Sequence, residues 1–416
     1  MSEMTATRIL ARVATITGAA ALWVLAAGFL WRTNVPSGLD LPALDADRYF
    51  SASELARTLR YERFHRVEWL LSIMATIGAL IVLARRGPRL AREIGLGRVS
   101  TGVVLGMLVL TTLWFVGLPF ALAARWWERR HGLTRGGYVD WFVEPWALLI
   151  GQVAFTLLTI VVVLVLAGLF PRRWWIVAAP AFTALALLFA FVFPYVDTVG
   201  THRPRQAVRA AAAQLERLEN VRGTPVLVDD VSDTTTQANA YSEGIGPSRR
   251  VVLWNTLLDG RFSFGEVKVV LAHELAHTQR RHVWKAIAWF GLFALLGAFL
   301  IAEVTRRRGG LRNPGVLPLA MLVLVLIGLA AAPIENEISR RYEAEADWIA
   351  LETTRDPAAA RRLFERFSST SLQQPDPPLW DYVLLETHPT IMQRIAMATA
   401  WRSRQHQLPP GGAGLR

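Results

Sequence analysis

Residues 263–302 read SFGEVKVVLAHELAHTQRRHVWKAIAWFGLFALLGAFLIA, and this stretch decides the architecture that we expect for the chain. Ser263 and Glu266 form a capping box, so a helix should begin near Phe264. Neither proline nor glycine occurs between Glu266 and Phe290. The second half of the stretch is apolar over a length that can cross a bilayer. We therefore predict a helix whose polar first half continues straight into a membrane span.

Other apolar runs in the chain also reach the length of a membrane-spanning helix, about 20 residues. With the run at 283–302, they cover residues 9–31, 67–84, 99–124, 146–170, 174–196 and 316–334. The first run follows Arg8 and Arg12 as a signal peptide would, but it is long for one and no small-residue cleavage site follows it. The sequence thus predicts an all-α polytopic membrane protein with about seven transmembrane helices.

Composition supports the membrane assignment. The chain has 416 residues, of which 53% are hydrophobic and 19% charged, whereas soluble domains carry about 25% charged residues. The net charge is +12, but the arginines lie in short clusters between apolar runs, for example Arg306, Arg307 and Arg308. That distribution is typical of membrane loops, so we expect a lipid bilayer and no nucleic acid as partner. Cysteine is absent, which excludes disulfides, a thiol nucleophile and a cysteine-bound metal.

Two segments are too polar to span a membrane, residues 197–282 and 335–416. In the first, the pattern predicts a helix over 205–220, strands over 226–228 and 249–254, and a loop over 229–248. The C-terminal segment is expected to be helical at both ends, around a proline-rich loop at 375–378. These two segments are expected to form a small α+β domain.

This reading divides the chain into five parts. They are an N-terminal five-span region (1–196), a loop domain with the His-Glu motif (197–282), spans six and seven (283–334), a C-terminal catalytic segment (335–402) and a disordered tail (403–416).

His273-Glu274-Leu275-Ala276-His277 carries the strongest chemical signal in the sequence. Residues i and i+4 of a helix share one face, so His273 and His277 can hold one Zn²⁺ ion. Glu274 then lies beside the metal, in the position of a general base.

A catalytic zinc site needs a third protein ligand. A metzincin would place glycine and histidine at positions 280 and 283, where this chain has Arg280 and Val283, so that class is excluded. The ligand must come from elsewhere in the chain. Glu343 and Asp347 are spaced i and i+4, which suits a ligand and a supporting carboxylate. The rival carboxylates are Glu335, Glu337 and Glu345.

At this point the sequence resembles the type I CAAX prenyl proteases, integral-membrane zinc peptidases of the gluzincin class with seven spanning helices. The resemblance covers almost the whole chain. It rests on Leu118-Pro119-Phe120, Glu128 to Gly132, Asn239-Ala240-Tyr241, Arg250 to Leu258, His273 to His277, Ser339 to Glu343 with Ala346-Asp347, His388-Pro389 and Arg394-Ile395. The Asn-Ala-Tyr and Ser-Arg-x-x-Glu-x-x-Ala-Asp matches are the more specific ones, because many metalloproteases carry the zinc helix. Ala344 and Glu345 depart from the family's aromatic-led pair after the ligand glutamate.

The resemblance implies a role for each matching residue. His273, His277 and Glu343 would hold one Zn²⁺ per chain, and Glu274 would act as general base. His388 would stabilise the tetrahedral intermediate or hold the substrate. The remaining implied roles are support of the site by Asp347 and Arg394, and pairing of the substrate backbone with a strand edge at Asn239 and Ala240. From the residues alone, a turn at Asn239 and a loop end at His388 remain open.

The expected function is that of a membrane-embedded zinc metalloendopeptidase that cleaves apolar or membrane-associated protein tails, as in CAAX processing. General membrane-protein quality control is the alternative enzymatic function. A non-enzymatic alternative is a seven-helix scaffold or a transporter. Residues 197–282 and 335–416 are expected on one side of the membrane, the catalytic side. Near the span ends, eighteen Arg and Lys lie on this side and twelve on the other. The positive-inside rule therefore favours a cytoplasmic catalytic side. An arginine-dominated, alanine-rich composition suggests a bacterial cytoplasmic membrane.

Overall fold

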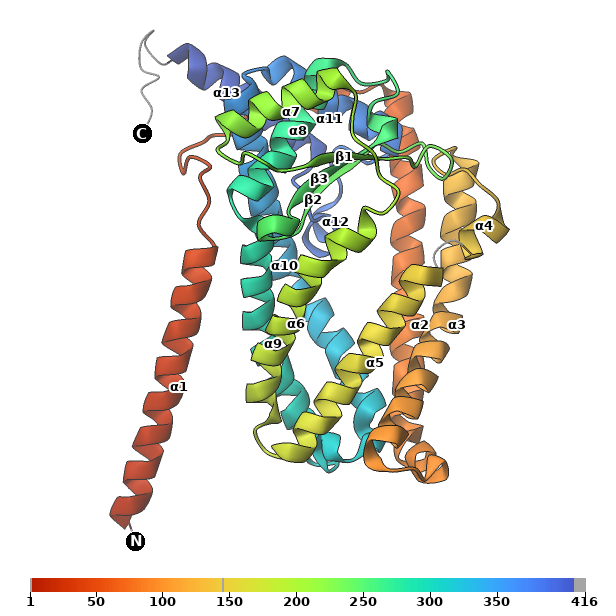
Figure 1. Ribbon diagram of the computed structural model, residues 1–416, viewed down its shortest axis with the longest axis vertical. Coiled ribbons are helices and arrows are strands. Elements are labelled where there is room, and N and C mark those ends of the chain that lie inside the picture. The colour runs from red at the N-terminus through yellow and green to blue at the C-terminus, as the bar shows by residue number, and fades with distance from the viewer. Residues whose placement is uncertain (1, 144–145, 408–416) are drawn as a thin grey trace.

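The computed structural model describes the backbone of residues 2–143 and 146–407, and the side chains of residues 14, 17–143 and 150–405. Long helices stand side by side, and a small sheet with shorter helices covers one end of them (Figure 1). The long helices are α1 (Ser2–Leu30), α2 (Ala52–Ile94), α3 (Arg98–Arg130), α5 (Trp146–Leu169), α6 (Trp174–Asp197), α9 (His282–Arg306) and α10 (Leu317–Thr354). The covering end holds α7 (Gln206–Leu218), β1 (Val226–Asp229), β2 (Ala240–Glu243), β3 (Arg250–Trp254), α8 (Phe264–Gln279), α11 (Pro357–Ser371), α12 (Leu379–Leu384) and α13 (Ile391–Gln407), with α4 (Tyr138–Val143) beside α3.

The predicted polytopic membrane architecture is confirmed. Within the described residues, six helices are long and apolar enough to cross a membrane: α2, α3, α5, α6, α9 and α10. The remaining predicted span, residues 9–31, corresponds to α1, of which the apolar stretch with described side chains runs only over Thr17–Leu30.

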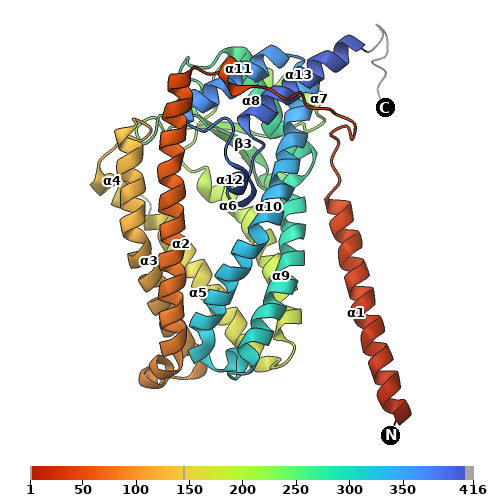
Figure 2. The same cartoon turned by 180° about the vertical axis from the view of Figure 1, so that it is seen from behind.

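The six long helices other than α1 form a closed ring. Helix α2 packs against α3, α3 against α5, α5 against α6, α6 against α9, α9 against α10, and α10 returns to α2. Helix α1 stands apart from this ring and contacts α9 near its own C-terminal end (Figure 2). The polar end of the molecule therefore rests on a ring of apolar helices.

A tight backbone contact closes the far end of the ring. The turn η5 (Pro314–Val316), just before α10, packs against α2. A Cβ atom on Gly87 would lie 2.3 Å from the backbone oxygen of Gly315. Only glycine lets the two segments approach this closely, because any side chain would overlap a backbone atom.

The sheet of the covering end has the order β1-β3-β2 in the described chain, with β1 parallel and β2 antiparallel to β3. Strands β1 and β3 agree with the predicted strands. Strand β2 lies where the sequence predicted a loop over 229–248, so that prediction was wrong for Ala240–Glu243. The strand escaped the pattern because it has only four residues and lies at an edge, where one side of its backbone is left for another partner.

The helix that begins near Phe264, as the capping box predicts, does not continue into the next span. Helix α8 ends at Gln279, and Arg281 takes a left-handed conformation with φ of 56° before α9 begins at His282. The prediction of one uninterrupted helix was therefore wrong. This conformation costs about 1–2 kcal/mol for a residue with a Cβ atom. Contacts of the flanking residues Arg280 and His282 with Glu345 stabilise the break.

Helix α10 runs without interruption from the far end of the ring into the covering end, past Pro333. It crosses the expected boundary between residues 334 and 335, so the last span and the segment with Glu343 are one rigid element. Helix α13 extends to Gln407. The disorder predicted for 403–416 is therefore wrong for residues 403–407, and residues 408–416 lie outside the described chain.

Candidate metal centre

Three side chains from two helices meet where α8 crosses α10. His273 and His277 come from α8 and Glu343 from α10, and their ligand atoms lie within 4.8 Å of one another. The His273 Nε2 atom lies 3.1 Å from His277 Nε2 and 3.1 Å from Glu343 Oε2. His277 Nε2 lies 3.6 Å from Glu343 Oε1. In a tetrahedral zinc site, neighbouring ligand atoms lie about 3.3 Å apart, so the spacing fits this metal.

The hydrogen bonds around His273 leave a lone pair directed at this centre. Asp347 Oδ1 lies 2.9 Å from His273 Nδ1 and accepts its proton, so Nε2 is free to bind a cation. Arg394 holds Asp347 in place through two hydrogen bonds of 2.8 and 2.7 Å. Burial opposes a charge on His273, but the carboxylates of Asp347 and Glu343 outweigh burial and raise its pKa, so a cation is favoured at Nε2, where a metal ion takes the place of the proton. The centre therefore favours a positive charge, and the donor set fits a zinc ion.

A second chain of hydrogen bonds orients His277, and the sequence analysis did not anticipate it. His277 Nδ1 lies 2.9 Å from His282 Nδ1, and His282 Nε2 lies 3.0 Å from Glu345 Oε2. When His282 donates its Nε2–H to the carboxylate, its Nδ1 accepts the proton of His277 Nδ1. The lone pair of His277 Nε2 then points at the centre.

Glu345 is fully buried and heavily bonded. Arg280 donates to it at 2.8 Å, the backbone N–H of Asn34 at 2.6 Å, and Lys285 lies 3.5 Å away. Glu345 thus faces away from the triad and anchors His282 instead. The interval of five residues between His277 and His282 was visible in the sequence, but the partner 63 residues further on was not.

Glu274 lies buried beside the triad. Burial raises the pKa of Glu274 above the ordinary value, and the nearby Ser242 side chain of β2 opposes this rise. Strand β2 therefore runs next to the side chain that the sequence singles out as a base.

The predicted backbone-pairing residues lie at the start of that strand. The carbonyl of Asn239 accepts a hydrogen bond from Trp254 at 3.0 Å, and its side chain is exposed. Ala240 pairs with Leu253 of β3. Both residues therefore belong to the edge strand β2 or its entry, as the family resemblance implied.

His388 joins the centre from the loop between α12 and α13. Its Nε2 lies 3.2 Å from Glu343 Oε2, and its side chain remains 47% exposed. Buried Arg340 of α10 holds the preceding loop by donating to the carbonyls of Tyr382 at 2.7 Å and Glu386 at 2.8 Å. Arg340 is a second supporting residue that the sequence analysis did not single out.

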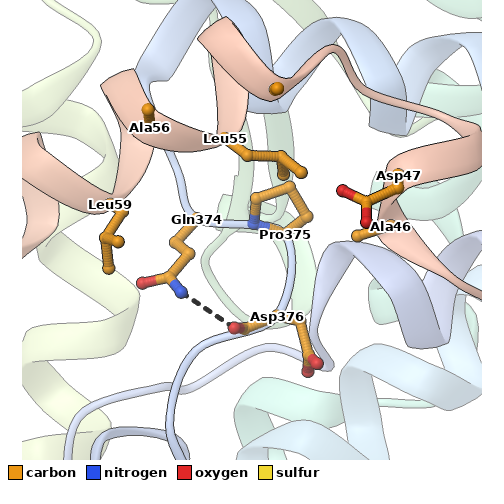
Figure 3. A pocket seen from close by; sticks show the side chains of 9 residues that line it. Ala46, Asp47, Leu55, Ala56, Leu59, Gln374, Pro375 and Asp376 are labelled. Carbon is orange, nitrogen blue, oxygen red and sulfur yellow. Dashed lines mark hydrogen bonds between the residues drawn. The ribbon is translucent and has the colours of Figure 1, made fainter.

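A separate hollow of about 430 Å³ lies between the start of α2 and the proline-rich loop. Figure 3 shows Leu55 and Leu59 on one side and Gln374, Pro375 and Asp376 on the other. The Gln374 side chain donates to the backbone oxygen of Asp376 at 2.9 Å. None of the residues that line this hollow belongs to the metal centre.

Three comparisons relate the chain to known proteins. The profile of peptidase family M48 matches residues 203–402. The chain is 28% identical to a Bacillus subtilis protein named uncharacterized metalloprotease YhfN, over 55% of this chain and 56% of that protein. It is also 28% identical to a protease HtpX homolog of Acidiphilium cryptum, over 56% of this chain and 91% of that protein. The crystal structure of S. mikatae Ste24p has the same fold, with a TM-score of 0.73, 18% identity and coverage of 91% and 96% of the two chains.

Proposed function

We propose that this chain, whose residues 203–402 match peptidase family M48, is an integral-membrane metalloendopeptidase that uses one zinc ion to cleave apolar or membrane-associated protein tails. The observation that carries the proposal is the convergence of His273, His277 and Glu343 beside buried Glu274. His273 and Glu343 are 70 residues apart in sequence, so their approach is a property of the fold.

The roles of the side chains follow from their positions. Bound zinc would polarise the scissile carbonyl and make water more acidic. Glu274 takes a proton from the attacking water and delivers it to the leaving amine. His388 donates a hydrogen bond to the oxyanion of the tetrahedral intermediate, since its exposed side can reach a substrate. Asp347 and Arg394 keep His273 in the tautomer that binds the metal.

Strand β2 supplies a place for an extended substrate. It pairs with β3 on one side only in the described chain, and its Ser242 contacts Glu274. A peptide added to the free edge would pass the base with its backbone hydrogen bonds satisfied. The ring of apolar helices below the site favours a substrate tail that is itself apolar or held at the membrane.

We further propose that the catalytic end faces the cytoplasm of a bacterial cell. The excess of Arg and Lys around the catalytic end supports this orientation, and relatives from Bacillus subtilis and Acidiphilium cryptum support the bacterial setting.

The test of the mechanism is Glu274→Gln in the purified full chain with zinc. We expect loss of peptide cleavage by about a thousandfold or more, with zinc stoichiometry unchanged because Glu274 is not among the ligands. Zinc analysis and cleavage of a fluorogenic peptide measure the two properties. Appreciable turnover in a zinc-loaded variant would remove Glu274 from the role of base.

The substrate is identified by comparing membrane peptides from cells with the intact enzyme and with Glu274→Gln. Short C-terminal tails that accumulate in the variant would support CAAX-like processing. Fragments from many unrelated membrane proteins would support general quality control instead.

A further inference from the structure

A cavity of about 790 Å³ opens directly beside the metal centre. His277 forms part of its wall, together with Thr278 and Gln279 at the end of α8. The second half of β2 and the turn after it, from Ser242 to Gly246, also line the cavity. The residue that follows α7, Glu219, lines it as well. A peptide lying along β2 would therefore place one of its side chains in this cavity.

The cavity contains buried oxygen atoms that lack partners. Neither carboxylate oxygen of Glu219, nor Oε1 of Glu243, nor Oε1 of Gln279 reaches a hydrogen-bond partner among the described residues. The Thr353 side chain opposes the rise in the pKa of Glu219, but it makes no normal hydrogen bond to the carboxylate. The side chain of Glu219 is only 1% exposed. A buried carboxylate without a donor is costly, because it loses its water and gains nothing in return.

The positive charges that the chain supplies near these carboxylates, His273 for Glu219 and Arg250 for Glu243, do not offset their burial. Burial raises the pKa of Glu219 to about 8 and that of Glu243 to about 7. Arg249, which also lines the cavity, donates instead to the Thr224 hydroxyl and the Arg222 carbonyl. Arg281 is exposed at the rim.

We propose that this cavity is a specificity subsite that takes a lysine or arginine side chain of the substrate, with Glu219 as its principal acceptor and Glu243 as a second one. The proposal rests on the proposed peptidase function and names a substrate feature that the metal centre does not define. An ammonium or guanidinium group would supply the missing donors and bring a further positive charge against the carboxylates.

The first experiment measures cleavage by the zinc-loaded full chain in detergent. Matched peptides carry lysine, norleucine or glutamate at each of the four positions on either side of the cleaved bond. We expect one position at which lysine raises kcat/KM over norleucine by about 10- to 100-fold. Glu219→Gln should abolish this preference while the norleucine peptide is still cleaved. Glu352→Gln, which removes an exposed carboxylate outside the cavity, should keep it.

A second experiment makes the result independent of turnover. In the zinc-loaded Glu274→Gln background, fluorescence anisotropy compares the binding of lysine and norleucine peptides with and without Glu219→Gln. Tighter binding of lysine that disappears with Glu219→Gln supports the subsite, even if no peptide is cleaved by the parent enzyme. An equal affinity for the two peptides, no binding of either peptide, or a lysine preference that survives Glu219→Gln overturns it. A preference for glutamate also overturns it and assigns the cavity to Arg249 and Arg281.

Discussion

At the scale of single residues, each candidate zinc histidine has its own buried carboxylate. Asp347 bonds directly to His273, whereas Glu345 acts on His277 through His282. Both carboxylates lie on α10, and both are paired with arginine, Arg394 and Arg280 respectively. Fixing both imidazoles in one tautomer lowers the cost of binding a metal, because the lone pairs already point at it.

This arrangement predicts different effects of the two neighbouring glutamates. Glu343→Ala removes a ligand and should abolish stoichiometric zinc binding. Glu345→Gln and His282→Ala should weaken zinc binding by about 10- to 100-fold without abolishing it. Competition with a zinc chelator measures the affinity, and the visible spectrum of the cobalt form reports the geometry of the ligands.

His282→Asn serves as the control, because its Oδ1 takes the place of the ring Nδ1 and can still accept from His277. It should recover part of the affinity lost in His282→Ala. Loss of stoichiometric zinc in Glu345→Gln with retention in Glu343→Ala would show that the ligand assignment is wrong.

At the scale of elements, α10 links the membrane ring to the site. One uninterrupted helix carries Pro318 at the far end of the ring and Glu343 at the metal centre. Its lower end is fixed where η5 meets Gly87 of α2. A change in that contact is therefore expected to act on the stability of the ring and, through α10, on the position of Glu343.

Two glycines of α2 predict opposite effects of the same substitution. In Gly87→Ala the new methyl would meet a backbone oxygen at 2.3 Å, whereas Gly78 has nothing within 4 Å of a new Cβ. Overpacking costs about 1–3 kcal/mol, and alanine stabilises a helix interior by about 0.5–1 kcal/mol relative to glycine. Gly87→Ala should lower the thermal unfolding midpoint in detergent, and Gly78→Ala should leave it unchanged or raise it. Equal midpoints for the two variants would contradict the close contact between α2 and η5.

At the scale of the whole molecule, the catalytic groups gather at one end. Helix α6 leads into the covering end, α9 leads out of it, and α10 leads back into it (Figure 1). Two spans separate His277 from Glu343, so a shared metal centre requires that both segments emerge on the same face. In the windows that identify the six spans, only 11–33% of the residues are buried by protein. Apolar side chains left uncovered to this extent need lipid around them.

The orientation in the cell is testable by labelling with an impermeant thiol reagent, because the chain has no cysteine of its own. Asp233 between β1 and β2 and Ser369 on α11 are exposed positions of the covering end, and exposed Arg307 directly follows α9, whose last residues lie at the other end of the ring. Single cysteines at these positions should be labelled in intact cells only at 307. Labelling at 233 and 369 but not at 307 would invert the orientation. Different results at 233 and 369 would contradict the shared face.

Features that depend on neighbours along the chain can be read from the sequence. Apolar runs give the spans, the Ser263–Glu266 capping box gives the start of α8 at Phe264, and helical periodicity brings His273 and His277 to one face. Each of these depends on hydrogen bonds or side chains within a few residues, which the sequence displays directly.

Which groups from distant segments meet depends on the three-dimensional fold. It placed Glu343 rather than Glu335, Glu337 or Glu345 against the two histidines. It also ended α8 before Arg281, because buried Glu345 offers partners to the residues on both sides of the break. The unpartnered carboxylate of Glu219 beside the centre is likewise invisible in the sequence. These features depend on the packing of helices that are some 60 to 70 residues apart, and local patterns carry no information about that packing.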